Sequence, residues 1–473
     1  MAPGLASCTE SESPVPPDAQ VAVHRTDPAA VHVDGTVFRD GQGRQLLFRG
    51  YNAKVTTLFD VTFDDGRVPE ETFPDLSEAM MTRVEQLGWN VLRIPVSWSG
   101  LEPHPLDYSA AFLAKLDAVV AMAAEHHVYL LIDMHQDGYS KEIGEDGEPL
   151  WAIEPPPTVL LQGPANDARR TSQPALQAGF NFFSNVAGAD GRLLQNAYVS
   201  AAQQMVTHLL GQPQILGYEA FNEPVVLSDK ELDAFHGLFA DTVHAIDLDA
   251  PVLFEPVGTR NETDSAAIPA SPFAHGPGAY AVHIYTCVFS TCTPPNWTTM
   301  DPSVLAPSMA HAEQERAGWQ TPLFVTEFGW DQTLPQGPPW LSAELDLQDQ
   351  YLASSTAWEL TESPTWALYD RDGNERTATS RVMARMFPRA VAGTLLKIER
   401  PKPVDMVVTY QADPGTNGLP SEVSLSADYV TNASVTCDGK SVELTPSLGR
   451  ATFTCPVSDS GVHVFEVVGT AAP

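Results

Sequence analysis

Short β-prone runs alternate with amphipathic helical stretches along most of the chain, and this alternation limits the folds that the sequence can adopt. Stretches with apolar residues at helical spacing, such as SEAMMTRVEQLG and DKELDAFHGLFADTVHAI, separate most of the runs. The segment between the fifth and sixth runs has no clear helix. Eight strands that alternate with helices favour a closed (β/α)8 (TIM) barrel, an α/β fold, over an open sheet. The eight runs are 46–51, 91–96, 128–133, 215–221, 252–255, 280–285, 323–327 and 365–369.

The two ends of the chain differ in composition from this central part. Residues 1–30 are rich in Pro, Ala, Ser and Asp, which predicts an extended N-terminal tail. The barrel is predicted over residues 31–396, and the Asp-Gly pair in VHVDGTVFRD predicts a hairpin at its start. In residues 397–473 short alternating runs are separated by turn residues, which predicts a C-terminal β-sandwich domain. We expect this domain to be a packed cap rather than a carbohydrate-binding module.

The charge of the chain excludes several classes of partner. With 60 acidic and 26 basic residues, the net charge of -34 disfavours binding to nucleic acid or to an anionic membrane through bulk electrostatics. No window approaches the roughly 18 consecutive apolar residues that a membrane span needs. We therefore expect any lipid contact to be at the membrane surface or inside a pocket, and we expect a monomer without a nucleic-acid partner.

The five cysteines favour an exported protein. Cys287 and Cys292 are close in one loop, and Cys437 and Cys455 lie near the end of the chain, so we expect two disulfides and an unpaired Cys8. Metal binding by the first pair is the alternative, but no cluster of His and Cys at zinc spacing accompanies it.

A short motif near the start bears on the location of the protein. The sequence LASC at residues 5–8 resembles the lipobox at which bacterial lipoproteins are cleaved and acylated. This motif predicts a secreted or cell-surface protein that could carry lipid on Cys8. The alternative is an ordinary disordered tail.

A long segment between about Gln136 and Gly188 interrupts the regular spacing of strands and helices. A loop of this length in a compact domain is usually a functional lid or a disordered insertion. Its large apolar residues argue against disorder, and they are Trp151, Leu160, Leu161, Phe180, Phe182 and Phe183. Two interpretations stay open: the loop buries these side chains on its own barrel, or they form an apolar groove for a lipid-like ligand.

Polar and aromatic residues gather at the ends of the predicted strands, where the active sites of (β/α)8 barrels lie. Glu223 and Glu327 would end strands four and seven and face each other across the barrel mouth. Two converging carboxylates suit the hydrolysis of a glycosidic bond, because one can donate a proton while the other attacks or stabilises an oxocarbenium-like centre. The whole set is Arg93 in VLRIPVSW, His135 in LIDMHQDGYS, Asn222 and Glu223 in GYEAFNEP, His283 and Tyr285 in AVHIY, Glu327 in FVTEFGW and Trp366 in PTWALYD.

This set, in its order and strand placement, resembles clan A of the glycoside hydrolases and, within it, family 5, over about residues 30–390. The resemblance implies a retaining mechanism with carboxyl groups about 5–5.5 Å apart, in which no metal or organic cofactor is required. Glu327 would attack the anomeric carbon, and Glu223 would protonate the leaving oxygen and then activate water.

The same resemblance implies roles for the surrounding residues. Arg93 and Tyr285 would contact the nucleophile, Asn222 would hold the 2-hydroxyl of the sugar, and Trp366 would form a stacking floor. His135 and His283 complete the set, either as sugar-binding residues or as structural histidines.

Three segments resemble the endoglycoceramidases of the actinobacterial type, the family 5 branch that releases an intact oligosaccharide from ceramide: FRGYNAK (48–54), DMHQDGYS (133–140) and YDRDGNE (369–375). By this resemblance Lys54, Asp137 and Trp366 would hold the first sugar, and the partner would be a glycosphingolipid. Three alternatives stay open: a β-glucanase or mannanase acting on polysaccharide, a galactosylceramide-specific relative, and a non-catalytic glycan- or lipid-binding protein on a degenerate barrel.

Overall fold

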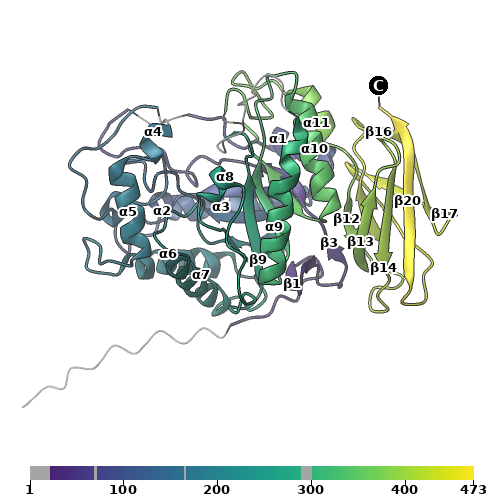
Figure 1. The fold of residues 1–473 in the computed structure, drawn as a ribbon, viewed down its shortest axis with the longest axis horizontal. Coiled ribbons are helices and arrows are strands. Elements are labelled where there is room, and N and C mark those ends of the chain that lie inside the picture. Colours follow the sequence, from purple (N-terminus) through teal and green to yellow (C-terminus); the bar gives the residue numbers. More distant parts are fainter. Residues whose placement is uncertain (1–21, 69–71, 165–166, 289–300, 362, 473) are drawn as a thin grey trace, which may run out of the picture.

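The computed structural model describes residues 22–68, 72–164, 167–288, 301–361 and 363–472. Eight parallel strands close into a barrel with helices around it, as predicted (Figure 1). In circular order the strands are β4 (Arg49–Asn52), β5 (Val91–Val96), β6 (Tyr129–Met134), β7 (Ile215–Glu219), β8 (Val252–Phe254), β9 (Gly278–Ile284), β10 (Leu323–Phe328) and β11 (Ser354–Ala357).

The eighth strand does not lie where the sequence predicted it. Residues 365–369 lie in an irregular turn, and the barrel is closed instead by β11, whose sequence SSTA has no apolar run. Its hydroxyls are buried but bonded: Ser355 Oγ donates to Gln348 Oε1 at 2.7 Å, and Thr356 Oγ1 donates to the Thr326 carbonyl at 2.6 Å. A polar strand can therefore lie inside the barrel, because its side chains replace the hydrogen bonds that they would make with water.

Helices cover the outside of the barrel, and several begin at a serine that accepts a hydrogen bond from the first helical turn, such as Ser77, Ser109 and Ser228. Between β8 and β9 the chain forms only the one-turn helix α8 (Arg260–Thr263), where the sequence showed no clear helix. The outer helices are α1 (Glu78–Gln86), α3 (Ala110–Glu125), α6 (Leu194–Leu209), α7 (Asp229–His244), α9 (Leu305–Trp319), α10 (Gly337–Gln350) and α11 (Thr377–Met383).

The long segment after β6 contains the short helix α4 (Asp167–Arg170) and the unpredicted helix α5 (Gln173–Phe183). Phe182 and Phe183 on α5 are 0% and 3% exposed. Both rings pack against Phe221 at centroid distances of 5.2 Å, and both also contact Phe235. These two phenylalanines belong to the core, so the interpretation that they line an open apolar groove is wrong. Phe180 is half-buried.

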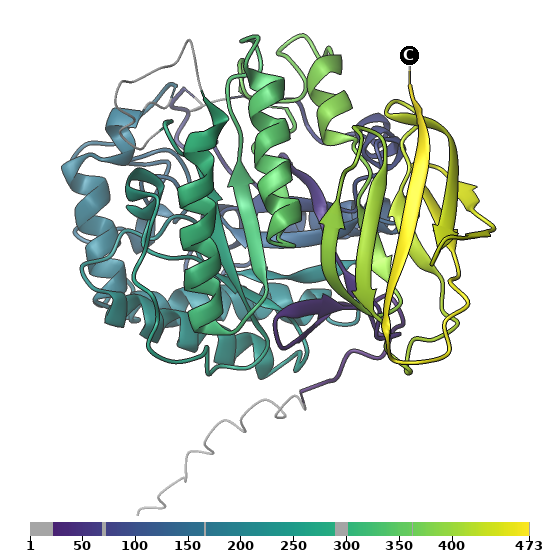
Figure 2. The same ribbon diagram turned by 45° about the vertical axis from the view of Figure 1, so that its right-hand side comes forward.

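The β-domain consists of two antiparallel sheets that share one apolar core, and it packs beside α10 and α11 (Figures 1 and 2). The predicted boundary at residue 397 falls inside a strand, and the domain already begins at β12. The first sheet has the order β1 (His32–Asp34), β2 (Val37–Arg39), β3 (Gln45–Leu46), β12 (Pro388–Val391), β15 (Ser421–Ser424), β19 (Arg450–Phe453) and β18 (Thr445–Ser447). The second has the order β13 (Thr394–Glu399), β14 (Met406–Gln411), β20 (Val462–Ala471), β16 (Val430–Cys437) and β17 (Lys440–Val442).

The N-terminal part of the chain connects the two domains. The predicted hairpin forms as β1 and β2, but it extends the first sheet of the β-domain through the pairing of β3 with β12. Residues 22–30 are not a free tail, because Val23 pairs with Asp247 and the Arg25 side chain donates to Asp247 and to main-chain carbonyls of β7. The rest of the predicted tail, with Cys8, lies outside the described residues.

A buried charge cluster joins the barrel to the β-domain. Asp349 on α10 accepts hydrogen bonds from Arg385 at 2.7 Å and from Arg400 at 2.8 Å, and Arg49 of β4 lies 3.4 Å away. Although burial alone would raise it, these three cations lower the pKa of Asp349 to about 2.

The predicted disulfide between Cys437 and Cys455 is present. Because Cys437 lies on β16 and Cys455 follows β19, it links the two sheets. Cys292, the expected partner of Cys287, lies outside the described residues. Among the helices that the structure describes, none combines the length and the apolar character needed to span a membrane.

Candidate active site

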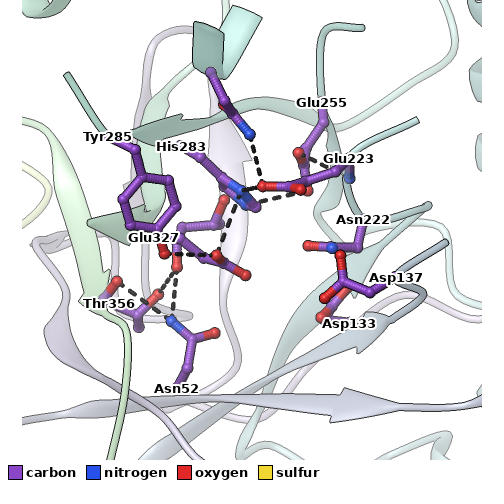
Figure 3. A network of polar contacts seen from close by, with 12 residues as sticks. Asn52, Asp133, Asp137, Asn222, Glu223, Glu255, His283, Tyr285, Glu327 and Thr356 are labelled. Carbon is purple, nitrogen blue, oxygen red and sulfur yellow. Dashed lines mark hydrogen bonds and ion pairs between the residues drawn. The ribbon is translucent and has the colours of Figure 1, made fainter. Parts of the chain in front are cut away.

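Glu223 and Glu327 approach each other at the C-terminal end of the barrel (Figure 3). Glu327 lies within β10, and Glu223 follows β7 with a positive φ of 43°. One carboxylate oxygen of each and a ring nitrogen of His283 all lie within 4.8 Å of one another. The Glu327 side chain is 6% exposed and that of Glu223 is 24% exposed. The two carboxyl groups are therefore close, but they lie in different environments.

Arg93 and Tyr285 each donate a hydrogen bond to one oxygen of the Glu327 carboxylate. Arg93 Nη1 donates to Oε1 at 2.7 Å, and the Tyr285 hydroxyl donates to Oε2 at 2.8 Å. Burial raises the pKa of Glu327, and the charges of His283 and Arg93 oppose that shift. Burial and the Glu327 charge raise the pKa of Tyr285 well above its usual value, so the phenol keeps its proton and remains a donor.

Arg93 is fully buried under the site and connects several strands of the barrel. Its Nε donates to Glu219 Oε2 at 2.6 Å, and its Nη2 donates to Asn222 Oδ1 at 2.9 Å and lies 3.0 Å from Asp133 Oδ2. Because a guanidinium donates in fixed directions, these bonds set the positions of side chains from β5, β6, β7 and β10 relative to one another. The Asn222 amide nitrogen donates to the Gln136 carbonyl at 3.0 Å.

The Glu223 carboxyl is held by a second group of residues on the far side of the mouth. Asn261 Nδ2 donates to Glu223 Oε1 at 2.6 Å, and His283 Nδ1 lies 2.8 Å from the same oxygen. His283 Nε2 lies 3.3 Å from Glu255 Oε1. Although burial alone would lower it, the charges of Glu255 and Glu327 raise the pKa of His283 well above its usual value. Burial raises the pKa of Glu255 to about 8.

His135 and Lys54 lie on the side of the mouth formed by the ends of β6 and β4, around an aromatic residue that the sequence did not predict. The His135 ring stacks on Trp358 with a centroid distance of 5.6 Å and an interplanar angle of 10°. Lys54 Nζ lies 5.3 Å from the Trp358 ring centroid and 4.3 Å from that of Phe59. The His135 Nδ1 atom lies 2.5 Å from Asp133 Oδ2, which fixes the orientation of the ring.

Asp137 also belongs to this side of the site. Its Oδ2 lies 3.6 Å from His135 Nε2 and 3.2 Å from Arg170 Nη2. Although burial alone would raise it, the Arg170 charge lowers the pKa of Asp137 to about 2. Asp137 is therefore an ionised acceptor beside the open mouth.

The predicted position of Trp366 at the end of the eighth strand is wrong, because that strand is β11 and Trp358 follows it directly. Trp366 lies in the turn beyond, half-buried, with its ring centroid 5.6 Å from that of Tyr285. The structure thus keeps Trp366 at the mouth but assigns the strand end to Trp358. Asn261 and Glu255 were missed as well: Glu255 ends a predicted strand, whereas Asn261 lies in the one-turn helix α8, which has no sequence signal.

Clusters of His, Asp and Glu at the mouth have the spacing of metal ligands, such as His135 with Asp137 and Asp146. Guanidinium groups already reach these clusters. Arg170 pairs with Asp137, and Arg93 pairs with Glu327. Arginine side chains of the protein therefore supply the positive charge that faces these carboxylates.

Comparisons with known proteins agree with this geometry. The family model described as cellulase (glycosyl hydrolase family 5) matches residues 52–363. Endoglycoceramidase I of Rhodococcus hoagii is 26% identical over 344 residues, which cover 61% of this chain and 67% of that protein. The endoglycoceramidase of Hydra vulgaris is 26% identical over 217 residues, 41% of this chain and 40% of that protein.

Solved structures share the whole architecture. Endo-glycoceramidase II from Rhodococcus sp. superposes with a TM-score of 0.74 at 22% identity, over 93% of this chain and 100% of that one. An endogalactoceramidase superposes with a TM-score of 0.75 at 20% identity over the same shares. Because the family model spans more than half of the chain and includes both Glu223 and Glu327, the chain belongs to glycosyl hydrolase family 5.

Proposed function

We propose that this protein is a retaining endo-glycosidase that hydrolyses the β-glycosidic bond between the oligosaccharide and the ceramide of glycosphingolipids. The observation that carries the proposal is the pair of carboxyl groups of Glu223 and Glu327, which lie in different environments and of which one oxygen each lies within 4.8 Å of the other. Such a close pair suits a nucleophile and an acid/base, whereas inverting enzymes leave room for a water molecule between carboxyl groups about 6.5–9.5 Å apart.

Glu327 is the nucleophile in this proposal. Its carboxylate attacks the anomeric carbon, the bond from that carbon to the ceramide oxygen breaks, and the bonding pair leaves with the oxygen. Arg93 and Tyr285 hold the two carboxylate oxygens, so the attacking group is already oriented when the sugar arrives.

Glu223 supplies the proton to the leaving oxygen. Because Asn261 and His283 both engage Oε1, the proton is carried on Oε2, which is the oxygen available to the leaving group. Glu223 then takes a proton from water, whose oxygen attacks the anomeric carbon and releases Glu327.

The residues on the opposite side of the mouth bind the first sugar. The ionised Asp137 accepts from sugar hydroxyls, Lys54 donates to them, and the Trp358 and Trp366 rings offer apolar surfaces for the sugar face. The Asn222 amide donates toward the 2-hydroxyl.

The ceramide is expected to leave on the Glu223 side. The chain directly after Glu223 is apolar, with Val225, Val226 and Leu227, and Leu227 is 66% exposed. This surface, rather than Phe182 and Phe183, is the proposed contact for lipid tails, and it also supports a transient contact with a membrane surface. The names of the relatives support glycolipid over polysaccharide.

We also propose a secreted or cell-surface location. Its support is the Cys437–Cys455 disulfide, because disulfides persist in oxidising compartments. Fractionation of the native host tests this location, and recovery in the cytosolic fraction would contradict it.

Product analysis tests the proposed function. Lactosylceramide and galactosylceramide in mild detergent, and cello- and manno-oligosaccharides in parallel, are incubated with the protein and with its Glu327→Gln variant. We expect intact lactose and free ceramide from the native protein and no product from the variant. Cleavage of only the soluble oligosaccharides would replace the proposal with a polysaccharide hydrolase, and cleavage of galactosylceramide alone would indicate the galactosyl-specific alternative.

A further inference from the structure

A cavity of about 770 Å³ lies beside the site on the same end of the barrel. Its walls come from the segments that follow β4, β5 and β6, including Phe59, Ser99 and Lys141. No role in the reaction proposed above uses this space.

Phe59 lies between the cavity and residues that surround the bond-breaking centre. Phe59 lines the cavity, and its ring lies 5.8 Å from the His135 ring and 4.3 Å from Lys54 Nζ. The acid/base Glu223, with Asn261 and His283, belongs to β7–β9 on the other side of the mouth. In the proposed reaction the leaving group departs beside Glu223, so the retained saccharide would point toward Lys54 and Phe59, the side on which the cavity lies.

The cavity carries an excess of negative charge. Its lining includes Asp60, Asp64, Asp65 and Glu142, against the cations Arg67 and Lys141. These four carboxylates and two cations have a formal net charge of minus two, with His104 of the lining counted as neutral.

Both cations in the described lining already have carboxylate partners. Arg67 donates to Asp65 at 2.8 Å and to Glu142 at 2.5 Å, and Lys141 donates to Asp60. A guanidinium or ammonium that recognised an anionic ligand here would first have to leave its own ion pair.

We propose that this cavity is a glycone subsite that accepts neutral hexose units and discriminates against sialic acid, so that the preferred substrates are neutral glycosphingolipids. This inference rests on the proposed function. Two half-buried rings in the lining, those of Phe73 and Trp151, offer surfaces on which a sugar can stack. The carboxylates of the lining can accept hydrogen bonds from sugar hydroxyls. The carboxylate of a sialic acid would meet like charge, and Arg67 and Lys141, the cations of the described lining, are already paired with carboxylates.

Binding to an inactive variant tests the subsite without requiring turnover. Isothermal titration of the Glu327→Gln variant compares two trisaccharides of equal length, neutral globotriose and 3′-sialyllactose. We expect globotriose to bind at least about 10-fold more tightly, since like-charge contacts cost affinity. Raising the salt concentration from about 50 mM to about 500 mM should bring the two affinities closer together, because salt screens the repulsion between the sialic acid and the carboxylates of the cavity.

Charge-neutral variants, made in the Glu327→Gln background, identify the carboxylates that are responsible. Asp60→Asn removes the partner of Lys141, and Asp64→Asn removes an exposed carboxylate at low risk to folding. Each variant should lower the ratio of the affinity for globotriose to the affinity for 3′-sialyllactose. Glu443→Gln makes an equal charge change on the exposed surface of the β-domain and should leave this ratio unchanged.

The outcomes separate this inference from the proposed function. Equal affinities for the two trisaccharides, or a ratio that neither cavity variant changes, would overturn the neutral-glycan subsite even if the native protein hydrolyses lactosylceramide. A preference for globotriose that responds to the cavity variants would support the subsite, and it would do so even if lactosylceramide were not a substrate and the proposed function failed.

Discussion

Replacement of Asn261 by alanine is expected to slow the hydrolysis of substrates whose leaving group needs a proton. Asn261 Nδ2 donates to Glu223 Oε1 at 2.6 Å, and the residue is only 8% exposed, so water does not easily replace the bond. Without this donor, Oε1 keeps only His283, and the carboxyl can rotate so that its proton no longer faces the leaving oxygen. In the proposed mechanism Asn261 is therefore a positioning residue.

The size of the effect follows from the kind of bond. A hydrogen bond to a charged carboxyl contributes about 1.5–3 kcal/mol, which corresponds to a loss of about 10- to 150-fold in kcat/KM. The loss is expected on lactosylceramide, whose leaving alkoxide must be protonated. On 2,4-dinitrophenyl lactoside the loss should be less than about 3-fold, because this leaving group needs no proton.

The assay compares the two substrates over a range of pH for the native protein, Asn261→Ala and a control. Asn196→Ala removes an exposed amide on the outer helix α6 and should match the native protein on both substrates. Equal losses by Asn261→Ala on both substrates, or no loss on either, would refute the positioning role. An unchanged thermal midpoint for Asn261→Ala is the check that the fold is intact.

Three further predictions concern the core, the domain junction and the acid/base. Phe182→Ala should cost about 3–5 kcal/mol of unfolding free energy in chemical denaturation and Phe180→Ala clearly less; a Phe182→Ala protein of native stability that loses activity only on glycolipid would restore the groove interpretation. Asp349→Asn should cost about 3–5 kcal/mol, because it leaves buried cations without their partner. The folded pKa of Asp349 is about 2, below the unfolded value of about 3.9, so the stabilisation from its charge is full above about pH 4 and is lost as the pH falls toward 2. The stability difference between the two proteins should therefore narrow over that window, and a difference that is constant with pH would contradict this. Glu223→Ala should lose most activity on lactosylceramide but keep activity on the dinitrophenyl lactoside, and uniform loss would count against the acid/base role.

The fold class was predictable because most barrel strands are continuous apolar runs, which parallel strands buried on both faces require. The position of the eighth strand was not predicted, because its residues are polar. The hydroxyls of Ser355 and Thr356 form hydrogen bonds inside the barrel, and a hydropathy pattern does not distinguish such a buried hydroxyl from one that faces water. That error moved the strand end from Trp358 to Trp366, so the ring that stacks on His135 was missed.

The site was predictable to the extent that its residues end strands. Glu223, Glu327, Arg93, His283 and Tyr285 follow from strand placement alone, and the structure brings all five into one network. Asn261 was not predictable, because it reaches Glu223 from the one-turn helix α8, whose position depends on tertiary packing.

The interpretation of Phe182 was open for a related reason. An aromatic residue in a long segment can face a ligand or the core, and only the position of α5 against Phe221 and Phe235 decides between them. The sequence pattern of the segment shows that these rings are buried somewhere, but not by what.

The most direct test of the central claim is to trap the proposed covalent intermediate. The native protein is incubated with 2-deoxy-2-fluoro-β-lactosyl fluoride and digested, and the modified peptide is sequenced by tandem mass spectrometry. We predict one fluorolactosyl group, attached to Glu327 in the peptide containing FVTEFGW, and no modification of the Glu327→Gln variant. Attachment to Glu223 or to another residue, or unlabelled protein that still hydrolyses lactosylceramide, would contradict the assignment of Glu327 as the nucleophile of a retaining glycosidase.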